Sequence, residues 1–192
     1  MLIAEAQKEV RSAFFGSFVS HLLVGAIWAA SAVVSTWSAP RYGMAVLFLA
    51  STMLFPLSTL ILRAMGRSAR LSAGNTLGQL AMQVAFTVPI GFIVIAAATL
   101  YRQNWFFPAS MIIVGAHYLP FIFLYGMWQF GVLAVLLIFG GVGLGLYGPE
   151  MFSLGGWLSA VVFVGFAFVG RSAILKEEGR STQMAARKNQ QK

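Results

Sequence analysis

The sequence holds two histidines, His21 and His117, and each lies inside an apolar stretch long enough to cross a membrane. An ionisable side chain in hydrocarbon is costly, so it usually faces a protein interior or a wet cavity. If the two stretches are antiparallel helices, both imidazoles lie roughly 12–13 Å from the same membrane surface, at 1.5 Å per residue. If the two helices touch, one bound proton or solute can lie between the two imidazoles.

Two other interpretations of the histidines stay open. Each imidazole could instead hydrogen-bond a nearby hydroxyl or carbonyl group and lock two helices together. Haem or a metal ion bound between His21 and His117 is the weaker alternative, because two histidines without a carboxylate make a poor metal site. We therefore expect no cofactor and no metal ligands.

Further polar residues are predicted at the same depth. Gln83 and Thr87 belong to a series of polar residues that begins at Asn75 and recurs every four positions, which places the series on one helix face. These residues either line a solute path or hydrogen-bond neighbouring helices. The predicted pocket consists of His21, Gln83, Thr87, His117 and Tyr118.

The sequence contains no set of residues typical of a catalytic site. It has no cysteine and no aspartate, and all five glutamates lie outside the apolar stretches. No serine–histidine–acid set, carboxylate pair or metal-ligand cluster can be drawn within those stretches. We therefore expect no catalytic residues and favour a protein that is not an enzyme.

Composition places the chain in a membrane. Hydrophobic residues make up 59% of it and charged residues only 9%, against about 25% charged in an ordinary soluble domain. Several uncharged runs have the length of a membrane-spanning helix, about 20 residues. The longest run, between Arg102 and Glu150, must fold back as two helices. The predicted fold is all-α, a polytopic membrane protein with six transmembrane helices.

Three regions are predicted along the chain. Residues 1–12 form an amphipathic cytoplasmic lead-in, with Ile3, Ala6 and Val10 on one side. Residues 13–170 form the six-helix transmembrane domain, and residues 171–192 form a basic, polar cytoplasmic tail. The expected spans are about 13–34, 42–62, 77–100, 105–126, 129–147 and 152–170.

The distribution of positive charge predicts the orientation. Of the 13 lysines and arginines, all but Arg41 and Arg102 lie on the side that holds both termini. Cytoplasmic loops carry an excess of these residues, so both termini are expected in the cytoplasm. Loop charge and anionic headgroups account for the net charge of +8. We therefore expect the lipid bilayer, and no nucleic acid, as a partner.

Prolines and glycines are predicted to shape the helices. Pro56, Pro89 and Pro120 each fall near the middle of a span, where proline removes a backbone donor and kinks the helix. Three kinked helices favour a central cavity of the kind that transporters use. Small residues allow helices to approach closely, and this packing role is assigned to Gly141, Gly145 and Gly156.

Two stretches of the chain together resemble a known family of membrane proteins. The residues that carry the resemblance are Pro56, Ser58, Gly66-Arg67, Gly74-Asn75, Leu77-Gly78, Trp105-Phe106-Phe107-Pro108 and Leu124-Tyr125-Gly126-Met127. Over about residues 5–170 the chain resembles an uncharacterised family of short bacterial six-span integral membrane proteins. The resemblance implies the fold and a bacterial inner (cytoplasmic) membrane. It implies no activity and carries over no catalytic residue.

Together these features favour transport or binding of a small solute or a proton, at a polar pocket in the first four spans. The alternative is a non-catalytic accessory subunit that packs against a membrane-protein partner, or a homo-oligomer, through its glycine-rich helices. Flux into liposomes that His117→Ala reduces would support the first function. A membrane protein that co-purifies in stoichiometric amount would support the second.

Overall fold

The structure is a computed structural model that describes the backbone of residues 1–190 and the side chains of residues 1–180 and Gln183. Over residues 1–190 it consists of helices and contains no strand, so the all-α prediction is confirmed. In chain order the elements are α1 (Ile3–Ala13), η1 (Phe15–Ser17), α2 (Phe18–Trp37), α3 (Pro40–Thr52), α4 (Leu54–Ala64), α5 (Leu77–Ala85), α6 (Thr87–Tyr101), η2 (Gln103–Trp105), α7 (Phe106–Tyr118), α8 (Phe121–Tyr125), α9 (Gln129–Tyr147) and α10 (Leu154–Gln190).

Several helices are long and apolar enough to cross a membrane. Four continuous helical segments qualify, and the bent pair α3–α4 makes a fifth if it is one span. The chain is therefore a polytopic helical membrane protein, as predicted. The continuous segments are Phe15–Trp37, Leu77–Tyr101, Gln129–Tyr147 and Leu154–Arg180.

The stretch predicted as the fourth span is broken. Helix α7 has 13 residues and α8 has 5, whereas a bilayer of roughly 30 Å requires about 20 helical residues. Both pieces together are needed to approach that length. The count of six membrane crossings thus stays a prediction.

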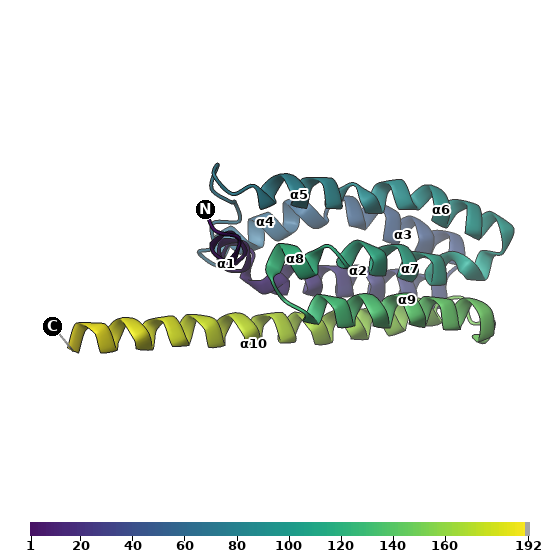
Figure 1. Ribbon diagram of the computed structural model, residues 1–192. Coiled ribbons are helices and arrows are strands. Elements are labelled where there is room, and N and C mark those ends of the chain that lie inside the picture. The colour runs from purple at the N-terminus through teal and green to yellow at the C-terminus, as the bar shows by residue number, and fades with distance from the viewer. Residues whose placement is uncertain (191–192) are drawn as a thin grey trace.

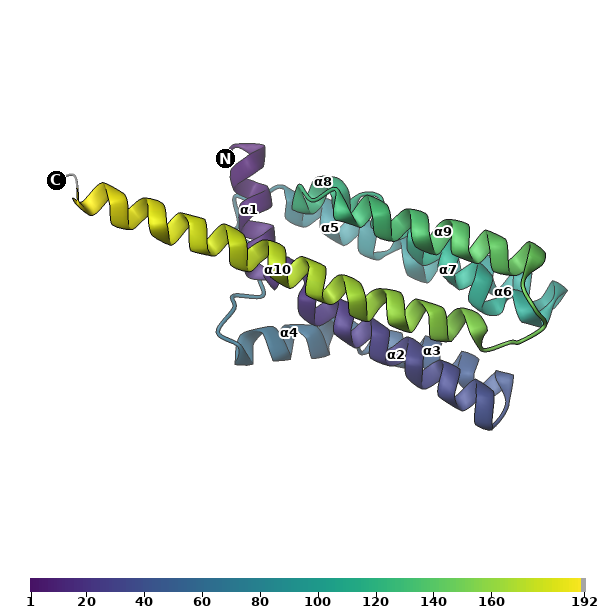
Figure 2. The same cartoon turned by 90° about the horizontal axis from the view of Figure 1, so that it is seen from below.

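The long helices form two groups that lie side by side. Helix α2 packs against α3 and α10, while α7 packs against α6 and α9 (Figure 2). Aromatic side chains join the groups, because the ring of Trp28 on α2 lies 5.9 Å from that of Phe107 on α7. Within its own group, the Trp28 ring lies 5.8 Å from that of Phe163 on α10. Phe107 and Phe163 are completely buried.

Three helix breaks lie close to the three prolines. The pair α3–α4 bends by 51° at Met53, three residues before Pro56. Helices α5 and α6 are separated at Phe86, three residues before Pro89, and α7 ends just before Pro120. Proline lacks an N–H group and clashes with the carbonyl group four residues earlier, which explains the position of these breaks.

The N-terminal helix α1 and the C-terminal part of α10 lie at the same end of the bundle (Figure 1). Helix α1 runs across the direction of the long helices and buries Ala6, Val10 and Ala13 against them (Figure 2). Ile3 is 59% exposed and does not share that buried face. Helix α10 continues without a break past residue 170, where the transmembrane domain was predicted to end, and projects beyond the bundle.

Candidate functional site

His21 lies in the interior, on the first turn of α2, among rings from three other helices. Its ring centroid is 5.4 Å from that of Tyr118 on α7, 5.7 Å from that of Phe130 on α9 and 6.2 Å from that of Phe163 on α10. The planes are tilted by only 23–30°, so the rings are close to stacked. We call Tyr118, Phe130 and Phe163 the aromatic cage. Only 2% of His21 is exposed.

Neither ring nitrogen of His21 has a hydrogen-bond partner among the residues that the structure describes. The main chain of Ser17, one turn earlier, is a polar neighbour, but it does not meet hydrogen-bond geometry. A buried polar group left unsatisfied costs about 1–3 kcal/mol. Such groups are rare in folded proteins and call for an explanation beyond packing. His21 is therefore the side chain of the predicted pocket that packing explains least.

His117, by contrast, is anchored. Its Nδ1 lies 3.0 Å from the carbonyl oxygen of Val84 and 2.9 Å from the hydroxyl oxygen of Thr87. A carbonyl oxygen can only accept, so Nδ1 carries the proton and Nε2 is the acceptor nitrogen. The Thr87 hydroxyl donates to the same carbonyl at 2.7 Å. These bonds fasten α7 to the break between α5 and α6, which fits the interpretation of His117 as a lock between helices.

Tyr118 connects the two histidines. Its ring centroid is 5.4 Å from that of His21 and 5.5 Å from that of His117. The structure thus brings four of the five predicted pocket residues into one series, in the order Thr87, His117, Tyr118, His21. Gln83 stands apart, because its side chain is exposed and no described hydrogen bond joins it to the other four.

This series runs from the surface into the core. Thr87 is exposed, His117 is half-buried, and Tyr118 and His21 are buried. The rings of the aromatic cage pack around His21, so aromatic side chains from three helices enclose the imidazole. A proton could bind there without displacing a ring, and aromatic faces within about 6 Å stabilise a cation. A larger solute would have to move the cage.

A family model matches residues 3–172, and the family is described as a family of unknown function (DUF7010). The chain belongs to this family. The resemblance to an uncharacterised family is therefore confirmed. No curated protein and no solved structure matches the chain.

Two cage residues were not predicted from the sequence. Phe130 and Phe163 come from α9 and α10, within long apolar runs where phenylalanine is ordinary. No spacing in those runs distinguishes them from residues that face lipid. Only the packing of the folded bundle, which brings both rings to within 6.2 Å of the His21 ring, identifies them.

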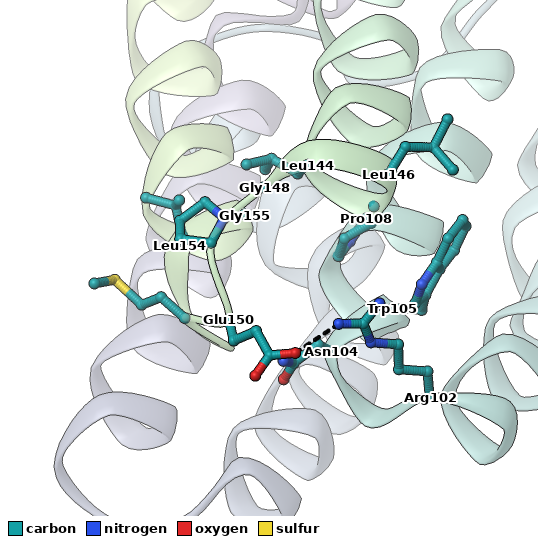
Figure 3. A pocket seen from close by; sticks show the side chains of 13 residues that line it. Arg102, Asn104, Trp105, Pro108, Leu144, Leu146, Gly148, Glu150, Leu154 and Gly155 are labelled. Atoms are coloured by element: carbon teal, nitrogen blue, oxygen red, sulfur yellow. Dashed lines mark hydrogen bonds and ion pairs between the residues drawn. The ribbon is translucent and has the colours of Figure 1, made fainter.

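A cavity of about 80 Å³ lies at the end of the bundle away from the termini, where the connections α6–α7 and α9–α10 meet (Figure 3). Arg102 and Glu150 form an ion pair there, with Nη2 2.7 Å from Oε1. Their side chains are 50% and 79% exposed, and such surface pairs contribute little stability. The cavity touches none of the predicted pocket residues. Among the described residues, no group of three or more His, Cys, Asp or Glu could hold a metal ion.

The three glycines assigned to packing all meet other parts of the chain. A Cβ atom on Gly141 would lie 2.6 Å from the carbonyl oxygen of Pro108, so α9 and α7 approach closely there. At Gly145 and Gly156 the nearest atoms belong to the rings of Trp105, at 3.3 Å, and Phe107, at 2.8 Å. These glycines face neighbours inside the molecule.

Proposed function

We propose that this protein is a multi-pass protein of a bacterial inner membrane that binds and moves protons or a small solute. His21 is the binding group, and His117 and Thr87 connect it to the outer face of the bundle. The observation that carries the proposal is the fully buried imidazole of His21 with two unpartnered ring nitrogens. A proton is the favoured cargo, because aromatic rings enclose His21 and only 2% of it is exposed.

The helix breaks support this proposal. Transporters build their sites from discontinuous helices whose freed backbone groups contact the cargo or the side chains that bind it. Here the carbonyl oxygen of Val84 lies just before the break at Phe86 and binds both His117 and Thr87. On α7 the break at Pro120 follows His117 and Tyr118 directly. The series from Thr87 to His21 therefore lies between two broken helices.

The test is proton movement in liposomes that hold the purified protein and a pH-sensitive dye. We expect the natural protein to dissipate a pH gradient, and His21→Phe to abolish this activity. Phenylalanine fills the same space in the cage but cannot take up a proton. Gln83→Ala is the matched control, because Gln83 lies outside the series, and it should leave the rate unchanged.

Two results would contradict the proposal. One is the absence of both proton flux and ligand-induced stabilisation across a broad panel of solutes. The other is an undiminished rate in His21→Phe. A membrane protein that co-purifies with the chain in equal amount would instead favour the role of an accessory subunit.

A further inference from the structure

Helix α1 closes the end of the bundle where the termini lie, and polar side chains hold it to α8. The side-chain amide of Gln7 donates to the carbonyl oxygen of Phe123 at 2.6 Å. Nη1 of Arg11 donates to the carbonyl oxygen of Tyr125 at 2.6 Å. The last carbonyl groups of a helix lack partners within that helix. Helix α1 therefore supplies the missing donors at the end of α8.

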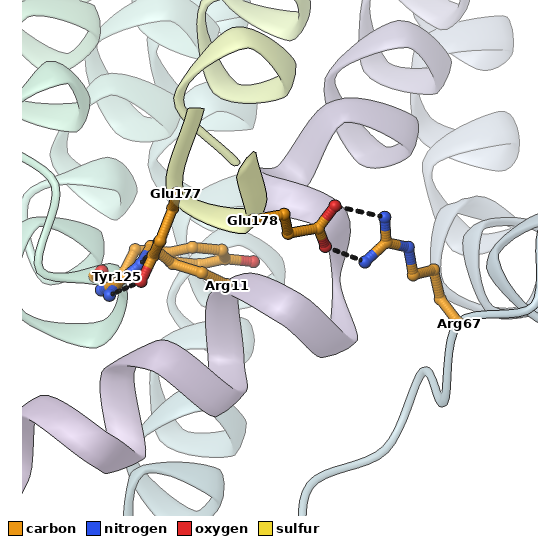
Figure 4. A network of polar contacts seen from close by, with 5 residues as sticks. All are labelled: Arg11, Arg67, Tyr125, Glu177 and Glu178. Atoms are coloured by element: carbon orange, nitrogen blue, oxygen red, sulfur yellow. Dashed lines mark hydrogen bonds and ion pairs between the residues drawn. The ribbon is translucent and has the colours of Figure 1, made fainter. Parts of the chain in front are cut away.

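The same arginine ties α1 to α10. Nε and Nη2 of Arg11 lie 2.8 and 2.9 Å from the two carboxylate oxygens of Glu177 (Figure 4). Paired bonds of this kind between arginine and carboxylate are among the strongest hydrogen bonds in proteins. Next to it, Arg67 of the α4–α5 connection binds Glu178 in the same two-pronged way. Consecutive glutamates of α10 thus hold both α1 and this connection.

A third set of contacts joins α1 to the α4–α5 connection itself. The carboxylate of Glu9 accepts hydrogen bonds from the backbone N–H of Ser72 at 2.5 Å and from the Ser72 hydroxyl at 3.0 Å. The side-chain amide of Asn75 donates to Glu9 at 3.0 Å and to the carbonyl oxygen of Ala6 at 3.1 Å. Only three small side chains of α1 are buried, so these polar contacts carry much of its attachment.

The turn that follows α1 is strained. Phe15, Gly16 and Ser17 have φ values of 49°, 58° and 65°, a left-handed conformation that residues other than glycine avoid. Close contact holds the turn in this form, because a Cβ atom on Gly16 would lie 2.7 Å from the carbonyl oxygen of Gly170. Such strain persists only where the surroundings impose it, and it is typical of segments that switch.

We infer that α1 is a displaceable strap. Its contacts with α8, α10 and the α4–α5 connection hold it across the end of the bundle, and the turn at Phe15–Ser17 is the hinge on which it leaves. Because α8 follows α7 directly after His117 and Tyr118, release of α1 frees the segment that borders the His117 site. Control of that site by the strap rests on the proposed function, but the movement of the strap does not.

Cysteine labelling tests the movement, since the natural chain has no cysteine. Ala6→Cys places a reporter on the buried face of α1 (4% exposed), and it should react slowly with a water-soluble maleimide. Adding Arg11→Gln removes the bonds to Glu177 and Tyr125. We expect the labelling rate to rise about tenfold or more, as the loss of a charge-assisted hydrogen bond predicts.

Two controls accompany this measurement. Ala134→Cys lies in the core on α9, completely buried, and should stay unlabelled with or without Arg11→Gln, which shows that the bundle remains folded. Arg63→Gln removes an exposed arginine at the end of α4 and should leave the Ala6→Cys rate unchanged.

Either of two results would contradict the proposal that α1 is a displaceable strap. One is an Ala6→Cys rate that Arg11→Gln does not change. The other is labelling of Ala134→Cys that rises in step, because the whole bundle would then be loosening. The strap and the proposed function fail separately: faster labelling without any flux refutes the function and leaves the strap standing, whereas flux with unchanged labelling does the reverse.

Discussion

The two histidines lie on either side of Tyr118, yet their surroundings differ. His117 reaches two oxygens at the break between α5 and α6, whereas neither ring nitrogen of His21 has a hydrogen-bond partner among the described residues. A hydrogen-bonded histidine is explained by the helices that it holds together. An unpartnered one adds no comparable stability, which is why the proposed function is assigned to His21.

Replacing each histidine with phenylalanine should separate these roles. His117→Phe removes a bond between α7 and the α5–α6 break, and we expect it to cost about 1 kcal/mol, since Thr87 still satisfies the carbonyl of Val84. His21→Phe removes an unsatisfied polar group and should be neutral or stabilising. Thermal unfolding in detergent, followed by tryptophan fluorescence, measures both. Equal losses of stability in the two variants would contradict the distinction.

Glu9 should make the attachment of α1 depend on pH. The backbone N–H of Ser72 and the amide of Asn75 hold the pKa of Glu9 below its ordinary value of 4.5. A carboxylate with a lowered pKa stabilises the folded state fully above that ordinary value, and this contribution is lost as the pH falls towards the lowered pKa. The natural protein should therefore melt above Glu9→Gln at pH 7, and the difference should shrink below pH 4.5. A difference independent of pH would contradict this role of Glu9.

Part of the candidate site was predictable at the scale of single residues. His21, His117, Thr87 and Tyr118 were identified because polar residues in apolar stretches are conspicuous. Gln83 was grouped with Thr87 by its spacing of four. The break at Phe86 and the packing of α7 decide which of these side chains face the interior. Residue spacing alone predicts neither the break nor the packing.

At the scale of elements, glycines set how closely neighbouring segments approach. The backbone of Gly170 on α10 lies against the strained turn, where an added Cβ atom would be 2.2 Å from the carbonyl oxygen of Gly16. On the same helix, nothing lies within 4 Å of a Cβ added to Gly165. The two positions therefore differ in packing while sharing one helix.

Substitution by alanine should reveal this difference. Gly170→Ala forces α10 away from the turn and should destabilise the protein by about 1–3 kcal/mol, the usual cost of overpacking. Gly165→Ala should be neutral or slightly stabilising, because alanine favours helix more than glycine does. Thermal unfolding of both variants provides the measurement. A loss in Gly165→Ala as large as that in Gly170→Ala would contradict the close contact at Gly16.

Sequence patterns predicted some elements better than others. The prolines located the helix breaks to within about one turn, because a proline ring excludes the preceding helical geometry wherever it occurs. The strap was expected only as an amphipathic lead-in. Periodicity shows which face of a helix is apolar, but Arg11, Glu9 and Gln7 find partners more than 60 positions away in the sequence. No local pattern encodes such partners.

At the scale of the whole molecule, α2, α3–α4 and α10 lie beside the group α5 to α9 (Figure 2). The aromatic core joins the groups along their length, and α1 joins them at one end. The uncharged runs predicted several apolar helices in sequence, and four or five segments of the structure are long and apolar enough to cross a membrane. The sequence could not predict how the segments group, because side chains that face lipid and side chains that face other helices are equally apolar.

The predicted orientation and the six crossings can be tested together with single cysteines. Reporters at Ser38 and Pro149 should react with an impermeant reagent in intact spheroplasts, because these connections lie at the end away from the termini. Reporters at Ser68 and Trp128 should react only after the membrane is opened. Labelling of Trp128→Cys in intact spheroplasts would show that α7–α8 does not cross the membrane, and would leave five crossings.

The unbroken length of α10 has one more consequence. Phe163 of the aromatic cage and Glu177 beside α1 lie 14 positions apart on this helix, which corresponds to roughly 21 Å of straight rod. Because α10 is continuous between these two residues, a tilt of the helix at Phe163 would also displace Glu177. The aromatic cage around His21 and the attachment point of α1 therefore lie on one continuous helix.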